Sequence, residues 1–84
     1  MTNQETTMAA LAEMVLSTVE ETQGQFGTPS GPMYAAFMAH GISLANYTKL
    51  IDGLVGSNFL HRRGAHCLAI TDKGKGFLKA LHAL

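Results

Sequence analysis

The most regular apolar pattern in the chain begins at Ile42 and continues to Val55. Apolar side chains recur at the three- and four-residue spacing of one helix face, and they are Leu44, Tyr47, Leu50, Ile51, Leu54 and Val55. The opposite arc, at about 100° per residue, carries small and polar residues, namely Ala45, Asn46, Lys49, Asp52, Gly53 and Gly56. Ser43 can cap this helix with its hydroxyl. The pattern predicts an amphipathic helix whose polar face leaves the backbone open to a partner.

A β-hairpin is predicted immediately after this helix, over residues 59–71. Asn58 tolerates the left-handed conformation that ends many helices. A two-residue turn at Gly64-Ala65 would close the hairpin and pair Phe59 with Ile70 and His61 with Leu68. This register would place the paired side chains on one face and bury Phe59 with Ile70.

The N-terminal part of the chain predicts a first helix and a connection. Residues 1–6 are polar and expected to be disordered, Thr6 or Thr7 can cap the helix, and the apolar spacing continues from Met8 to about Gln23. The following segment, Gly24 to Pro29, is punctuated by glycine. We expect Phe26 to enter the core there and a short strand to pair with the hairpin.

A second helix is expected from about Ser30, which can cap it, with Pro32 in its first turn and Gly41 as its stop. Its inward side chains are either Met33, Phe37 and His40 or Tyr34, Phe37 and Met38.

The last helix is expected over residues 73–84, with Thr71 as its cap. Its inward stripe is predicted to be Phe77, Leu81 and Leu84, flanked by Leu78 and Ala80, while Lys73, Lys75 and Lys79 face solvent.

The order of these segments resembles a known family. A helix, Asn58 where Gly is usual, the strand FLHRR, a tight turn and LAITDKGKGFL are similar to the winged helix-turn-helix domains of MarR- and PadR-type regulators of bacteria and archaea. In those domains a β-hairpin, the wing, closes on a Leu-Thr-x-Lys-Gly-like segment, and Ile70-Thr71-Asp72-Lys73-Gly74 matches it in residue type. The resemblance covers roughly Gly31 to Leu81.

The resemblance implies a mostly α fold with a small β-hairpin, made of a three-helix core, a two- or three-stranded wing and a C-terminal helix. Residues 1–84 would form a single domain, with the helix-turn-helix at 31–57, the wing hairpin at 59–71 and the C-terminal helix at 73–84. The step from Ala39 to Ser43 contains a glycine, as is typical of the turn between such helices. Phe37 departs from the family, which usually has a small residue there.

Charge and composition add two observations. The first 48 residues contain four Glu and no Lys or Arg, whereas the remainder contains all six Lys and Arg against two Asp, so the halves carry −4 and +4. Hydrophobic residues make up 46% of the chain, which is more than a core of 84 residues hides easily. We therefore expect a homodimer through the first and last helices, using Met8, Leu11, Met14, Leu16, Leu78 and Leu81.

Catalytic and metal chemistry find little support in the sequence. The chain has one cysteine, so no disulfide can form within it, and no apolar run is long enough for a membrane span. His61, His66 and Cys67 share the hairpin, but their spacing matches no zinc motif and a fourth ligand is missing. We expect a cytoplasmic protein without catalytic residues, metal or cofactor.

Two functions fit these patterns. The first is a small dimeric transcription regulator that binds double-stranded DNA, with Ser43, Ala45, Asn46, Thr48 and Lys49 in the major groove and Arg62, Arg63 and His66 on the backbone or minor groove. The second is a winged helix that contacts a protein partner and does not bind DNA. Asp52, the glycine pair Gly53 and Gly56, and the net charge of zero favour the second.

Overall fold

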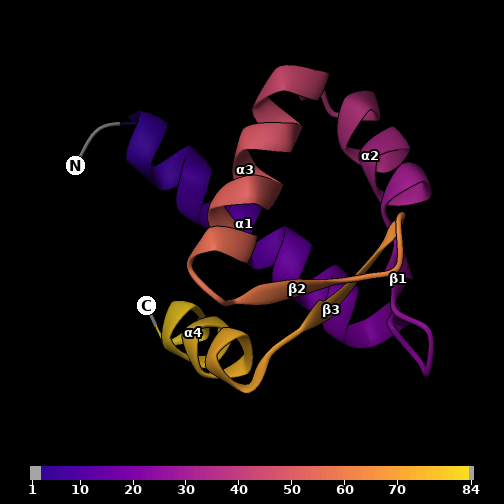
Figure 1. Ribbon diagram of the computed structural model, residues 1–84. Helices are drawn as coiled ribbons and strands as arrows, with labels where there is room; N and C mark the ends of the chain where they lie inside the picture. Colours follow the sequence, from indigo (N-terminus) through magenta and orange to yellow (C-terminus); the bar gives the residue numbers. More distant parts are fainter. Residues whose placement is uncertain (1–2, 84) are drawn as a thin grey trace.

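A computed structural model describes the backbone of residues 3–83 and the side chains of residues 9–83. The described part consists mainly of helices, with one small antiparallel sheet (Figure 1). The elements in order are α1 (Asn3–Thr22), β1 (Thr28–Pro29), α2 (Ser30–Ala39), α3 (Leu44–Gly56), β2 (Leu60–Arg63), β3 (Cys67–Ile70) and α4 (Asp72–His82). The mostly helical fold with a small hairpin is therefore confirmed. Within these residues no helix combines the length and apolar character needed to cross a membrane.

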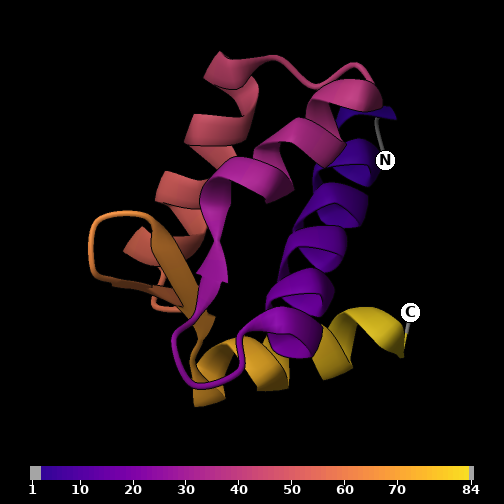
Figure 2. The same cartoon turned by 90° about the vertical axis from the view of Figure 1, so that its right-hand side faces the viewer.

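The three strands have the order β1-β3-β2, and both neighbouring pairs are antiparallel. β1 pairs with β3 through Thr28 and Leu68, which confirms the short strand predicted in the connection. α4 packs against α1, α3 lies against both α1 and β2, and α2 lies against α3 and β1 (Figure 2).

The core forms where α1, α3 and the sheet meet. Its most buried large side chains are Val15, Leu16, Val19, Leu60 and Leu68. Phe37 of α2 is also buried, and its ring meets Tyr47 of α3 edge-on, with 5.7 Å between ring centroids. A large residue at position 37 is thus accommodated as an aromatic contact between the two helices.

The ends of the helices follow local chemistry in most cases. The Ser43 hydroxyl accepts the Asn46 N–H at 3.2 Å, and the Thr71 hydroxyl accepts the Gly74 N–H at 2.9 Å, so both predicted caps are confirmed. Asn58 has the predicted left-handed conformation, with φ of 67°, and Gly41 follows α2 with φ of 89°. Ser30 is the first helical residue of α2, and Pro29 is the cap residue, so the capping role predicted for Ser30 is wrong.

The start of the first helix also differs from the prediction. α1 already begins at Asn3, so Thr6 and Thr7 lie within it and residues 3–6 are helical where we expected disorder. The segment from Asn3 to Thr22 contains neither Gly nor Pro, and nothing in its backbone chemistry forces a later start. Residues 1–2 of the predicted disordered segment lie outside the described residues.

The hairpin register is shifted by one residue from the prediction. Leu60 pairs with Ile70 and Arg62 with Leu68, which leaves the three residues from Gly64 to His66 as the loop. Gly64, the first residue of this loop, has φ of 64°, a left-handed conformation that glycine adopts without strain. A shift of one residue moves every side chain of a strand to the other face, and here it places Leu60 in the core.

Phe59 consequently lies before the strand. Its ring stacks on Phe77 of α4 at 4.3 Å between centroids, and this contact replaces the predicted pairing with Ile70.

Two apolar side chains lie elsewhere than predicted. Phe26 is 82% exposed, because Gly27, with φ of 91°, packs against β3 and turns its neighbour outward. Leu44, in the first turn of α3, is 58% exposed and lies beyond the edge of the core.

In α4 the fully inward residue is Leu78, whereas Phe77 and Leu81 are only half-buried and Leu84 lies outside the described residues. Gly74 is buried one turn before Leu78, where α4 approaches the Phe59 backbone closely. This contact sets the rotation of α4 about its axis.

Candidate nucleic-acid interface

The outer arc of α3 is open to solvent along its whole length. The inner residues Tyr47, Leu50, Ile51 and Leu54 are buried. The residues that the sequence assigned to the opposite side are all exposed, and they are Ala45, Asn46, Lys49, Asp52, Gly53 and Gly56. We call these six residues the open arc. Ser43 and Thr48, the other two residues assigned to DNA on this helix, are also exposed. A partner could therefore approach α3 without any repacking of the core.

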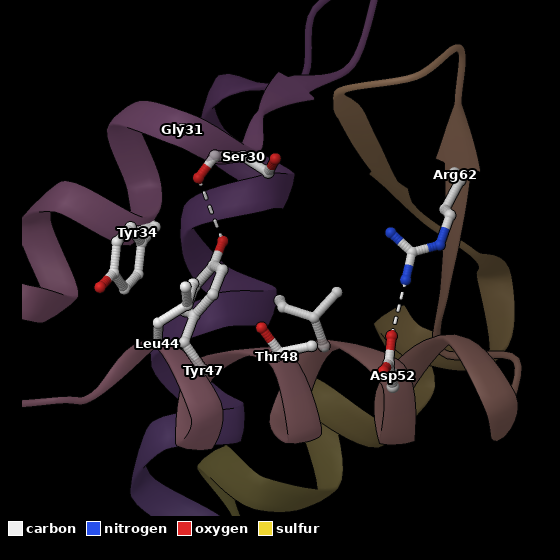
Figure 3. A pocket seen from close by; sticks show the side chains of 9 residues that line it. Ser30, Gly31, Tyr34, Leu44, Tyr47, Thr48, Asp52 and Arg62 are labelled. Carbon is white, nitrogen blue, oxygen red and sulfur yellow. Dashed lines mark hydrogen bonds and ion pairs between the residues drawn. The ribbon is translucent and has the colours of Figure 1, made fainter.

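The three hairpin residues assigned to DNA are also exposed, but their contacts diverge. Arg62 points toward α3, where its Nη2 lies 2.7 Å from Oδ1 of Asp52 (Figure 3). Arg63 donates from Nη1 to the carbonyl oxygen of Gln25 at 2.6 Å, in the connection between α1 and β1. The structure thus brings Arg62 to the open arc and Arg63 to the opposite side of the hairpin. His66 lies in the loop between them and β3.

The Arg62 and Asp52 ion pair is a surface contact. The two side chains are 53% and 60% exposed, so solvent screens their attraction and the pair contributes at most about 1 kcal/mol to folding. Its main consequence is positional, because it ties the guanidinium to the same arc that carries Lys49. Sequence reasoning did not predict this contact, which joins residues ten positions apart across a helix end and a strand.

A shallow cleft of about 270 Å³ lies beside this ion pair, between the start of α2 and α3 (Figure 3). Its lining residues are Ser30, Gly31, Tyr34, Leu44, Tyr47, Thr48, Ile51, Asp52 and Arg62. The Tyr47 hydroxyl donates to the Ser30 carbonyl at 3.2 Å, and burial raises the pKa of this phenol above its usual value. Leu44 lines this cleft and is exposed. Because the helical spacing assigned Leu44 to the core, the sequence did not indicate the cleft.

The positive charge of the C-terminal half is divided between two regions. Lys49, Arg62 and Arg63 belong to α3 and the hairpin, whereas Lys75 and Lys79 of α4 share a hollow with Glu20 of α1. Lys73 donates to the Ser57 carbonyl at 3.0 Å and lies 5.1 Å from the Phe59 ring centroid. The sequence half with net charge +4 therefore does not form one basic face.

The residues predicted for a dimer interface are not all available for it. Leu16 and Leu78 are 0% and 3% exposed, so both belong to the core of the single chain and their assignment to an interface is wrong. Met14 is 41% exposed, and Leu11 and Leu81 are half-buried. The side chain of Met8 lies outside the described residues. Leu78 was predicted to flank the inward stripe of its helix, a position at which spacing alone cannot separate core from surface.

No group of three His, Cys, Asp or Glu side chains suited to hold a metal ion occurs among the residues that the structure describes. Cys67 is half-buried in β3, His61 and His66 are exposed, and His82 lies 3.2 Å from Glu13. Comparison with known proteins gives no relative: no family model, no curated protein and no solved structure matches the chain.

Proposed function

We propose that this chain is a winged helix-turn-helix domain that binds double-stranded DNA, as a small dimeric transcription regulator. The observation that carries the proposal is the open arc of α3, a helix with one face locked in the core and the other exposed beside a hairpin that bears two arginines. A helix presented in this way fits the major groove, and a neighbouring hairpin reaches the backbone or the minor groove. The resemblance to MarR- and PadR-type domains supports the same arrangement.

The proposal assigns different tasks to the exposed residues. Asn46 has an amide that can pair with adenine, and Lys49 can donate to guanine or to a phosphate. Ser43, Ala45 and Thr48 line the groove-facing surface around them. Arg63 and His66 would contact phosphates beside the hairpin, since both side chains are exposed there.

A homodimer would place two α3 helices on paired half-sites about one helical turn apart. Met14, with Leu11 and Leu81 beside it, is the apolar surface left for this contact after Leu16 and Leu78 are assigned to the core. Sedimentation at tens of micromolar tests this part of the proposal. A monomer mass of 9.0 kDa would remove the dimer, and Met14→Asp should otherwise dissociate it while helix content is retained.

A titration with generic duplex DNA at low and at moderate salt tests the DNA-binding proposal. A complex held by phosphate contacts weakens steeply as salt rises, with a slope of log K on log salt of about −0.9 per contact. Binding at low salt with such a slope supports the proposal. The lack of any complex at low salt would overturn it.

Contact with a protein partner is the second candidate. It is favoured by the cleft beside α3, where the exposed Leu44 and the ring of Tyr34 offer apolar surface. Replacing Leu44 by Ser should leave DNA binding unchanged under the first proposal, since Leu44 is not among the residues assigned to DNA, and should reduce partner affinity under the second.

A further inference from the structure

Asp52 is the acidic residue of the open arc, and its position is unusual for a surface that meets DNA. It follows Lys49 by three residues on the same side of α3, so both side chains would face the same stretch of groove. A carboxylate there repels the phosphate backbone, because like charges oppose each other wherever water is partly excluded. A DNA-binding surface selected only for affinity would not carry it.

The contact that Asp52 makes gives this residue a second effect. Its Oδ1 lies 2.7 Å from Nη2 of Arg62, so the hairpin cation closest to the open arc is already paired in the free protein. A phosphate must therefore compete with the Asp52 carboxylate for this guanidinium. Both side chains remain more than half exposed, and the exchange of one anionic partner for another therefore requires no movement of the core.

We infer that Asp52 is a specificity-determining residue, which holds Arg62 away from phosphates and so suppresses binding to unrelated DNA. On the preferred site, the contacts of Asn46 and Lys49 with the bases bring the hairpin close enough for Arg62 to change partner. On other sequences those contacts are missing, and the ion pair persists. The inference rests on the proposed DNA binding, and it explains why the arc carries an acid without requiring a protein partner.

Asp52→Asn tests the inference because it keeps the shape of the side chain and removes its charge. Glu21→Gln is the matched control, since Glu21 is exposed in the last turn of α1, outside α3 and the hairpin, and its replacement changes the net charge by the same amount. Fluorescence anisotropy with a labelled random-sequence duplex, at several salt concentrations, measures affinity and salt slope together.

We expect Asp52→Asn to bind random duplex roughly five- to tenfold more tightly than the parent and to steepen the salt slope by nearly one unit, which corresponds to one additional phosphate contact. Glu21→Gln should change affinity by less than about twofold, since it removes a charge of the same size but leaves the pair between Asp52 and Arg62 in place. In an Arg62→Ala background, Asp52→Asn should no longer change the slope, because the slope gain requires the released guanidinium.

The outcomes distinguish the failure of the inference about Asp52 from the failure of the proposed DNA binding. If the parent binds DNA and Asp52→Asn binds no more tightly than Glu21→Gln, the inference fails and the proposed function stands. If Asp52→Asn binds tightly but its slope gain persists without Arg62, Asp52 acts by repulsion alone and the holding role is overturned. If neither the parent nor Asp52→Asn binds at low salt, the proposed function and this inference fail together.

Discussion

α3 and α4 both contain glycines, but Gly74 of α4 lies in surroundings opposite to those of Gly53 and Gly56 in α3. In α4, Gly74 is buried, and a Cβ added there would overlap the carbonyl oxygen of Phe59 and the side chain of Ile70. In α3, Gly53 and Gly56 are exposed, and a Cβ on either would meet nothing within 4 Å. Glycine inside a helix is unfavourable by roughly 0.5–1 kcal/mol relative to alanine in each case.

This difference distinguishes a glycine that the fold requires from glycines that the fold does not require. Gly74 allows the start of α4 to approach the backbone that leads into β2, so packing within the chain explains it. Packing within the chain explains neither Gly53 nor Gly56. A partner that approaches the backbone of α3 closely would account for both.

Gly74→Ala should have the largest effect on folding. The added methyl group must displace either the Phe59 backbone or α4 itself, and such overpacking destabilises by about 3 kcal/mol. Urea unfolding followed by circular dichroism measures the change. Gly76→Ala, in the same helix but with open space around it, should instead stabilise by about 0.5–1 kcal/mol. Equal effects at both positions would contradict the close packing of α4.

Asn46→Ala should act on recognition alone, because the Asn46 side chain is exposed and only its backbone N–H takes part in the cap. We expect a loss of about 1–3 kcal/mol on the preferred DNA site, found by selection from random duplexes, and little change on unrelated DNA. Unfolding free energy should stay within about 0.5 kcal/mol of the parent. A uniform loss on all sequences would remove Asn46 from the base contacts.

Replacing Arg62 and Arg63 together by alanine should weaken binding most on the preferred site, where both arginines contact phosphates, and less on unrelated DNA, where Arg62 of the parent stays paired with Asp52. On the preferred site, two lost phosphate contacts correspond to roughly tenfold weaker binding, and the dependence of log K on log salt should flatten by nearly one unit per contact. The matched control removes the same charge from α4, as Lys75→Ala with Lys79→Ala, in the hollow beside Glu20. An arginine variant with the parental slope would show that the hairpin does not contact phosphates and would favour the protein-contact function.

Gly53→Ala should stabilise the free protein by about 0.5–1 kcal/mol, since the methyl group meets open space and the helix gains propensity. The same variant should weaken binding if a partner lies against the α3 backbone. Unfolding and DNA titration of one preparation give both values. A stabilised variant with unchanged binding to DNA would mean that contact with DNA does not need the glycine.

Tyr47→Phe probes the buried face of α3. Loss of the bond to the Ser30 carbonyl should cost about 0.5 kcal/mol near pH 8. Burial raises the pKa of Tyr47 in the folded state, so the contribution of the neutral phenol is present below about pH 10 and is lost as pH rises through the folded-state value. The parent should therefore lose stability more steeply than the variant above about pH 10. Parallel unfolding curves at every pH would contradict this.

Local chemistry was sufficient for much of the fold. The inner face of α3, the caps at Ser43 and Thr71 and the left-handed Asn58 each depend on residues within a few positions of one another, and all were predictable from sequence. The open arc follows from the same periodicity, which is why the DNA-assigned residues of α3 are exposed together.

The remaining features of the fold depend on contacts between residues far apart in the sequence. The hairpin register depends on Leu60 entering the core, and the rotation of α4 depends on Gly74 meeting the Phe59 backbone. Exposure of Phe26 and burial of Leu16 and Leu78 are equally nonlocal, because an apolar residue on the shoulder of a helix is buried only if another element covers it. The ion pair between Asp52 and Arg62 arises in the same way, since only the return of the chain in β2 brings the guanidinium beside α3.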